Sequence, residues 1–305
     1  MARTARRVLK LGLVIVIVAA VVMGAASSDV RVRRRIQFLS WKLTGSLPYV
    51  NLRELWGALW PSRLKSSDLP PGYFVREKEQ GEEPCPVLWE TPLGTFWGQR
   101  KDNLTLQDPR HLDRYERGPV AIHSGDVVVD IGSQIGTFTR MALGKGASRV
   151  VSIEPDPTDS ACFKRTFQKE IAEGRVVLVE AALWERSGTT KFVVASRSDA
   201  GAIASKFDPR WGADRVIDVP TTSLDDTVQR LNLARVDFVK WAIGAATGPA
   251  LRGARETLSH FRPRMAILMV KDTPTDDPVA LPRLARQAVP TYNVFTYELQ
   301  LLYFY

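Results

Sequence analysis

Residues 127–157 constrain the fold of this chain more than any other segment; they read VVVDIGSQIGTFTRMALGKGASRVVSIEPDP. An apolar run leads into Asp130, and Gly132 and Gly136 follow. A helical stretch then leads to a second apolar run that ends on Glu154. Two buried strands joined through a glycine-rich turn and a helix are typical of an α/β protein with a parallel sheet.

The polar residues at the two strand tips indicate what this unit binds. An acidic residue at the second tip, here Glu154, can accept hydrogen bonds from both ribose hydroxyls of a nucleoside. The spacing D-x-G-x-x-x-G differs from the G-x-G-x-x-G of dinucleotide folds, and the Asp130 carboxylate would repel a pyrophosphate. S-adenosylmethionine has no phosphate, and its cationic amino group and sulfonium suit an acid at Asp130. Two alternatives stay open: a turn in which Asp130 merely caps Ser133 or Gln134, and a nicotinamide-dependent enzyme.

The charge distribution argues against nucleic-acid binding. The net charge is +9, yet residues 1–65 alone hold 12 Lys and Arg against 2 Asp and Glu, a surplus of +10. The remaining 240 residues hold 30 against 31, a balance of −1. A globular part that is nearly neutral does not predict a groove that follows phosphates.

The basic residues flank the apolar segment 11–26, LGLVIVIVAAVVMGAA. A short membrane-spanning helix can form when flanking basic side chains such as Lys10 and Arg31 reach the interface. A cleaved signal peptide is the alternative, but the Arg cluster at 31–35 resists translocation. We expect an uncleaved, single-pass anchor at residues 1–30. The two flanks carry similar basic charge, so the cytoplasmic location expected for the catalytic domain rests on where the cofactor is made and on the cysteines. Cys85 and Cys162 give no disulfide framework and suit a reducing compartment.

Residues 31–86 are predicted to form a basic, aromatic juxtamembrane segment followed by a linker. Trp41, Tyr49, Trp56 and Trp60 suit a membrane–water interface, although a helical extension packed on the globular domain explains them equally well. The polar, proline-containing stretch 65–81 is predicted to be the linker. The globular domain is then expected at residues 87–305.

Alternating patterns in the globular part predict a doubly wound sheet. Helices are expected near 136–144, 159–173, 224–231, 249–260 and 279–288. Strands are expected near 127–131, 149–154, 175–180, 189–194, 216–221, 236–241, 264–270 and 292–297. The stretch 196–215 is loop-like.

From about residue 87 onward the chain resembles the FkbM family of S-adenosylmethionine-dependent methyltransferases. The segments that carry the likeness are DVVVDIGSQIGTFT at 126–139, SIEPDP at 152–157, AALWERSGTTKF at 181–192, VPTTSLDDTVQRLNLARVDFVK at 219–240 and LRGARETLSHFRPRMAI at 251–267. The resemblance implies a class I methyltransferase (Rossmann-like) fold, α/β, with a seven-stranded, mostly parallel sheet and one antiparallel strand. It implies methyl transfer to a hydroxyl on a sugar, glycan, lipid or natural product.

The resemblance also assigns residues to the cofactor. It places Asp130, Gly132, Ser133 and Gly136 at the methionine end of S-adenosylmethionine. It places Glu154 at the ribose, and Pro155, Asp156, Ala181 and Ala182 at the adenine.

The chain departs from the family pattern after residues 237–240. The family continues with I-D-V-E-G-A-E, whereas this chain has Ala242 and Gly244 in place of two acids and Thr247 in place of a third. Transfer to a hydroxyl usually needs a base, and Lys240 is the nearby candidate, although a lysine beside a sulfonium is a poor base. Two hypotheses follow: a membrane-tethered methyltransferase, and a degenerate module that binds the cofactor or acts as a scaffold without turnover. Neither a metal site nor an oligomeric state is indicated by the sequence.

Overall fold

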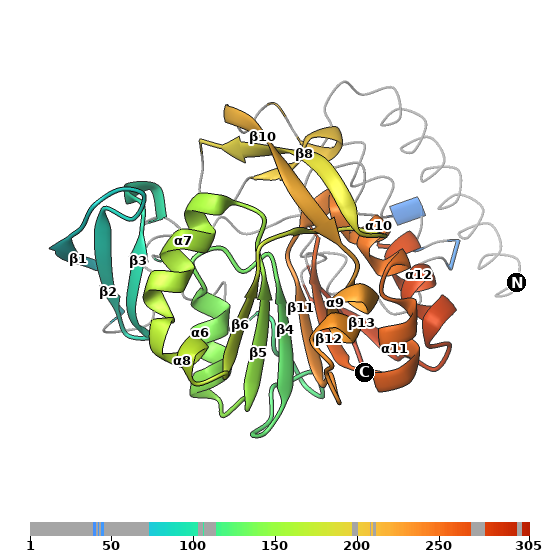
Figure 1. Cartoon of the computed structure of the whole chain (residues 1–305). Coiled ribbons are helices and arrows are strands. Elements are labelled where there is room, and N and C mark those ends of the chain that lie inside the picture. The colour runs from blue at the N-terminus through green and yellow to red at the C-terminus, as the bar shows by residue number, and fades with distance from the viewer. Residues whose placement is uncertain are drawn as a thin grey trace, which may run out of the picture. The chain divides into compact units, whose positions relative to one another are not determined.

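The computed structural model describes residues 39–40, 42, 44–45, 73–102, 106, 114–196, 201–207, 209, 212–269, 278–297 and 301–305. Nearly all of the fold belongs to one compact unit, Leu64–Phe295 with Gln300–Tyr305. The described residues form three sheets (Figure 1). None of the helices in these ranges is long and apolar enough to cross a membrane. The expected anchor at residues 1–30 lies outside the described residues.

The central sheet contains the two strands that the sequence predicts most strongly. Its strands are β4 (Val127–Ile131), β5 (Arg149–Ile153), β6 (Val176–Val179), β11 (Phe238–Trp241), β12 (Arg264–Leu268), β13 (Val294–Tyr297) and β14 (Leu301–Phe304). They are ordered β13-β14-β12-β11-β4-β5-β6. The pairs from β12 through β6 are parallel, and β14 runs antiparallel to β12. The seven strands and the mostly parallel order confirm the expected methyltransferase-like α/β fold.

Two groups of helices accompany this sheet. The helices are α6 (Thr137–Gly144), α7 (Pro157–Thr166), α8 (Gln168–Ala172), α9 (Leu224–Arg230), α10 (Thr247–Arg252), α11 (Arg255–Phe261) and α12 (Ala280–Ala288). The first three gather beside β4–β6, and the last four beside β11–β14 (Figure 1). Burial on both faces explains the continuous apolar runs, since Val128, Val129, Val150 and Val151 are completely buried.

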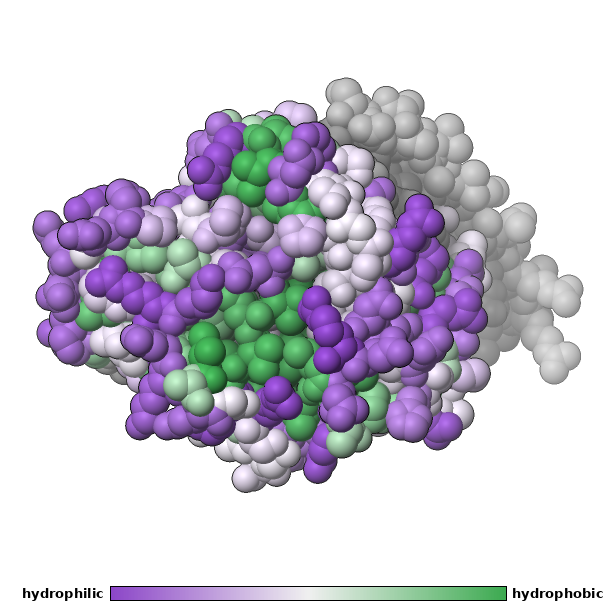
Figure 2. All heavy atoms as spheres, viewed as in Figure 1, coloured by the Kyte–Doolittle hydropathy of each residue, from purple (hydrophilic) through white to green (hydrophobic). Residues whose placement is uncertain are grey.

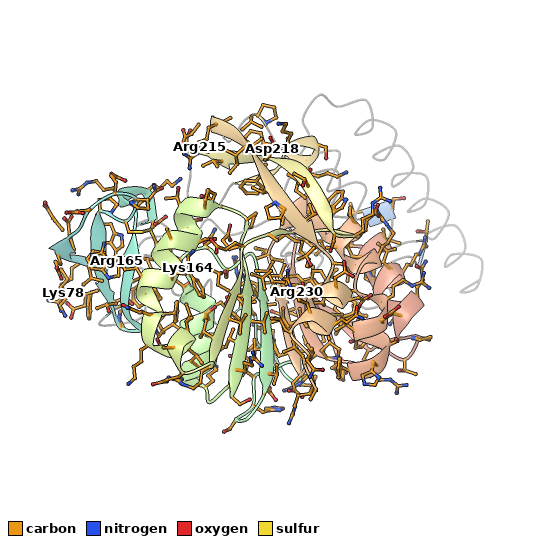
Figure 3. The ribbon with its side chains drawn as sticks, in the orientation of Figure 1. Lys78, Lys164, Arg165, Arg215, Asp218 and Arg230 are labelled. Carbon is orange, nitrogen blue, oxygen red and sulfur yellow. A yellow bond between two sulfur atoms is a disulfide. The ribbon has the colours of Figure 1, made fainter. Side chains whose placement is uncertain are left out.

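A second, smaller sheet contains two strands that the sequence had suggested for the doubly wound sheet. It has the order β7-β10-β8-β9, with β7 at Ala182–Leu183, β8 at Gly188–Ala195, β9 at Ala202–Ile203 and β10 at Ala213–Thr222. The pairing of β8 with β10 is antiparallel, so these strands leave the parallel array. Arg215 and Asp218 lie on the outer part of β10 (Figure 3), and apolar residues gather beside charged ones on this sheet (Figure 2).

A third sheet spans the expected domain boundary at residue 87. The strands β1 (Arg76–Gln80), β2 (Val87–Thr91) and β3 (Gly94–Gly98) form an antiparallel meander. The predicted linker at 65–81 is therefore wrong for β1, whose five residues are all exposed and charged or polar. Such an edge strand has no alternating apolar pattern by which a sequence could reveal it.

The meander packs against α7 through a shared apolar core. This core includes Trp89, Phe96, Phe163 and Phe167. Arg165 of α7 lies between the helix and the meander (Figure 3), with its guanidinium 3.2 Å from the centre of the Trp97 ring. This packing also brings Cys85 close to Cys162, although the two cysteines are 77 positions apart in the chain.

Cys85 and Cys162 form a disulfide with their Cα atoms 5.4 Å apart. The expectation that these two cysteines give no disulfide framework is therefore wrong. Cys85 lies in the loop between β1 and β2, and Cys162 lies in α7, so the bond ties the meander to that helix. The proximity arises from packing between distant segments, and a count of two cysteines carries no information about such packing.

Candidate functional site

A cleft opens at the carboxyl ends of β4 and β5. Its empty volume is about 700 Å³, counting the open mouth. Residues at the tips of β4 and β5 form its base, and the start of α7 and Lys101 form one side. Residues of β7, β8 and β9, Gly201 and residues after β11 contribute the rest of the lining. The carboxyl ends of parallel strands are where open α/β sheets bind ligands.

The glycine turn after β4 approaches neighbouring backbone very closely. Gly132 has a φ of +74°, and a Cβ atom added there would lie 2.5 Å from the Ala242 carbonyl oxygen. Gly136 has a φ of +92°, and a Cβ atom there would collide with the rings of Phe163 and Phe167. Positive φ angles favour glycine, so both positions of the D-x-G-x-x-x-G pattern have a physical reason. Gly132 lines the cleft, and Gly136 supports the turn from behind.

Glu154 presents its carboxylate to the cleft from the end of β5. One carboxylate oxygen accepts a hydrogen bond from the Gln134 backbone N–H at 2.8 Å, and the other accepts one from the Asp156 backbone N–H at 2.9 Å. Each oxygen therefore keeps a lone pair for a further donor. Burial of the carboxyl raises the pKa of Glu154 to about 7, although the two backbone hydrogen bonds oppose this rise.

Asp130 and Lys240 form an ion pair beneath the glycine turn. The Lys240 ammonium lies 2.9 Å from the Asp130 carboxylate, and their side chains are only 6% and 0% exposed. The same ammonium donates to the Gly132 carbonyl at 2.7 Å. Thr139 donates to the other Asp130 oxygen at 2.8 Å. Neither Asp130 nor Lys240 lines the cleft. Lys240 instead stabilises the glycine turn through its bond to the Gly132 carbonyl. Its role as a base stays a prediction.

The remaining residues that the resemblance assigns to the cofactor fall into two groups. Pro155, Asp156 and Ala182 line the cleft. Ser133 and Ala181 are buried beside it, and the Ser133 hydroxyl has no hydrogen-bond partner within the described structure. Asp156 caps α7, since its carboxylate accepts from the Thr158 N–H at 2.8 Å.

The end of β11 offers the cleft an apolar surface. Ala242, Ile243 and Ala246 line it, and Ala242 stands at one of the positions where the family pattern has an acid. The ionisable lining residues are Lys101, Glu154, Asp156 and Asp159, and the three acids all come from the end of β5 and the start of α7. The described residues hold no group of three or more His, Cys, Asp or Glu side chains that could hold a metal ion.

Two ionisable residues that line the cleft, Lys101 and Asp159, were not predicted from the sequence. Lys101 follows β3 and donates to the Ala195 carbonyl at 3.2 Å, which links the two sides of the cleft. Asp159 is in the first turn of α7 and only 5% exposed. The position of Asp159 five residues after Glu154 was a signal that could have found it, since a helix that follows a strand starts beside that strand's tip.

The fold and the site together define an α/β protein of the methyltransferase type with a nucleoside cleft. Residues 130–290, more than half of the chain, match the model of the methyltransferase FkbM domain. The chain belongs to this family of S-adenosylmethionine-dependent methyltransferases.

The comparison with solved structures finds matches at low sequence identity. The FkbM methyltransferase of Methylobacillus flagellatus is 18% identical, with a TM-score of 0.44, and the match covers 68% of this chain. This chain spans 56% of the length of that protein. A SAM-dependent methyltransferase from Aquifex aeolicus is 13% identical, with a TM-score of 0.36, over 66% of this chain and 94% of that one. No curated protein matches this sequence.

The residues present fit S-adenosylmethionine. Glu154 has free acceptor capacity for ribose hydroxyls, and the missing Cβ of Gly132 leaves backbone open to the cleft. Acidic lining residues complement the positive sulfonium, and no anion-binding array of lysines or arginines lines the described cleft to favour a pyrophosphate. Glu154, Gly132, Pro155 and Ala182 are the residues that would hold the cofactor.

Proposed function

We propose that this protein methylates a hydroxyl group on a sugar, glycan, lipid or natural product at a membrane. The observation that supports this most directly is the Glu154 carboxylate, fixed by two backbone N–H groups at the base of the cleft. Bound there, S-adenosylmethionine supplies an electrophilic methyl group. Lys240 holds the Gly132 turn in place, and the walls orient the acceptor hydroxyl for an in-line approach.

This protein differs from the family pattern in the groups that could remove the proton from the acceptor hydroxyl. The apolar end of β11 provides no carboxylate beside the methyl position. Orientation of the acceptor would therefore carry the rate. The acceptor oxygen would gain the methyl group as the methyl–sulfur bond breaks and the sulfonium becomes the neutral thioether of S-adenosylhomocysteine, and the hydroxyl proton would pass to solvent at the open mouth of the cleft. The same apolar surface favours a second candidate function: a membrane-tethered module that binds the cofactor without turnover. Release of S-adenosylhomocysteine on incubation with a membrane extract would favour the enzyme over this module.

Calorimetric titration of S-adenosylmethionine into the full-length chain tests cofactor binding. We expect micromolar binding by the wild type and at least about 100-fold weaker binding by Glu154→Ala, because the variant loses two charge-assisted hydrogen bonds to ribose. Glu180→Ala is the matched control, since Glu180 is exposed, pairs with Lys164 and does not line the cleft. A folded wild type that binds nothing would overturn the proposal, and undiminished binding by Glu154→Ala would remove Glu154 from the ribose.

We further propose that residues 1–30 anchor the chain in a membrane with the catalytic domain in the cytoplasm. Synthesis of the cofactor in the cytosol supports a cytoplasmic domain. The Cys85–Cys162 bond is typical of oxidising compartments and argues for a domain on the outer side of the membrane. Protease treatment of intact cells separates the two. We expect the domain to resist digestion until the membrane is opened. Digestion of intact cells down to the anchor would place the domain outside.

A further inference from the structure

We propose that Asp159 recognises the base of the bound nucleoside by forming hydrogen bonds with N1 and the 6-amino group of adenine. This inference rests on the proposed binding of S-adenosylmethionine. Asp159 lines the cleft and is 95% buried, as its exposure of 5% shows. No hydrogen bond or ion pair joins its carboxyl to another residue in the described part of the chain. A buried polar group normally has a partner, so this carboxyl has unused capacity for a ligand.

The strand order places Asp159 on the base side of the cleft. Glu154 at the tip of β5 marks the ribose. The Gly132 turn and the end of β11 lie on one side of that tip, because the order is β11-β4-β5-β6. Thus the methionine portion is directed toward β4 and β11, and the base toward β6 and α7. Leu183, which follows β6, and Pro155 offer apolar surface there.

The charges around Asp159 favour its neutral form. Burial is the largest cause that raises its pKa well above the ordinary value, and the carboxyls of Glu154, Asp102 and Asp156 raise it further. Lys101, whose ammonium also donates to the Ala195 carbonyl, opposes this rise, and its effect is smaller than those of burial and the three carboxyls. The carboxyl of Asp159 is therefore protonated more readily than that of an exposed aspartate.

A neutral carboxyl offers one O–H donor and one C=O acceptor side by side. Adenine presents the complementary pair, because N1 accepts and the 6-amino group donates. An ionised carboxylate could accept from the amino group but would repel the N1 lone pair. The structure thus favours a two-bond contact with the protonated acid, and the other three acids around Asp159 help to keep it protonated.

The test compares two ligands in two proteins at neutral pH. The ligands are S-adenosylhomocysteine and its purine analogue lacking the 6-amino group, and the proteins are the full-length wild type and Asp159→Ala. We expect the wild type to bind the analogue at least about tenfold more weakly than S-adenosylhomocysteine, because a buried acceptor loses its donor. In Asp159→Ala this discrimination should disappear. Equal discrimination in both proteins would overturn the inference.

Asp159→Asn tests the protonation state. Its amide keeps one donor and one acceptor and cannot ionise, so we expect affinity within a few-fold of the wild type. Loss of binding by a folded Asp159→Asn protein, as large as that caused by Asp159→Ala, would show that an ionised acid is required and would overturn the donor half of the pairing. Failure of the wild type to bind either ligand would instead refute the proposed function. Circular dichroism of each variant verifies folding.

Discussion

Lys240→Met is expected to lower the free energy of unfolding by about 3–5 kcal/mol, the usual cost of removing one partner from a buried ion pair. The Asp130 carboxylate is fully buried, and without Lys240 its one remaining partner among the described residues is the Thr139 hydroxyl. Methionine fills a similar volume, so the effect reports the lost charge more than a cavity. Urea denaturation followed by circular dichroism measures it.

Two companion variants make this result specific to the buried pair. Lys164→Met removes an exposed pair with Glu180, in which both side chains are about half exposed, and should cost about 1 kcal/mol or less. Adding Asp130→Asn to Lys240→Met removes the stranded charge and should recover part of the loss. A Lys240→Met protein as stable as Lys164→Met would show that the pair contributes little.

Gly132→Ala is expected to weaken S-adenosylmethionine binding by about 100-fold and to destabilise the fold by about 3 kcal/mol. The added methyl group would meet the Ala242 carbonyl oxygen at 2.5 Å, so the turn or the end of β11 must move. Strain from the left-handed backbone adds to this cost. Titration calorimetry and urea denaturation of the same preparation measure both effects.

Gly174→Ala is the matched control for this substitution. Gly174 has a φ of +71°, close to the +74° of Gly132, but nothing lies within 4 Å of an added Cβ atom. It should cost about 1 kcal/mol from backbone strain alone and leave cofactor binding unchanged. If both variants behaved alike, the close approach of Gly132 to Ala242 would have no consequence beyond its φ angle.

The sequence predicted the nucleoside half of the fold well. The residues of β4 and α6 fall within one position of the expected ranges, because a completely buried apolar run and a glycine-bounded helix are strong local signals. The other predicted strands of the central sheet also appear, whereas β14 was not predicted. The residue ranges of β8 and β10 were predicted, but their membership of a separate antiparallel sheet was not. The pattern of a strand does not indicate which strand it pairs with.

Features that depend on distant contacts could not be predicted. The bond between Cys85 and Cys162 requires the meander to sit on α7. The pairing of Lys240 with Asp130 joins residues 110 positions apart. Both strands were predicted, yet only their neighbouring register, with Lys240 opposite Asp130, shows that the two charges meet.

The burial of Lys240 has a consequence for how the cleft distinguishes a methyl donor from the molecule left after transfer. Because Lys240 neutralises Asp130, the described lining keeps one cation, Lys101, among three acids. The acids of this lining outnumber its cation, and in their ionised form they attract a positive charge. S-adenosylmethionine carries a sulfonium charge that S-adenosylhomocysteine lacks, so transfer of the methyl group removes an attraction. The electrostatics of the cleft thereby favour departure of the spent cofactor and its exchange for a fresh one.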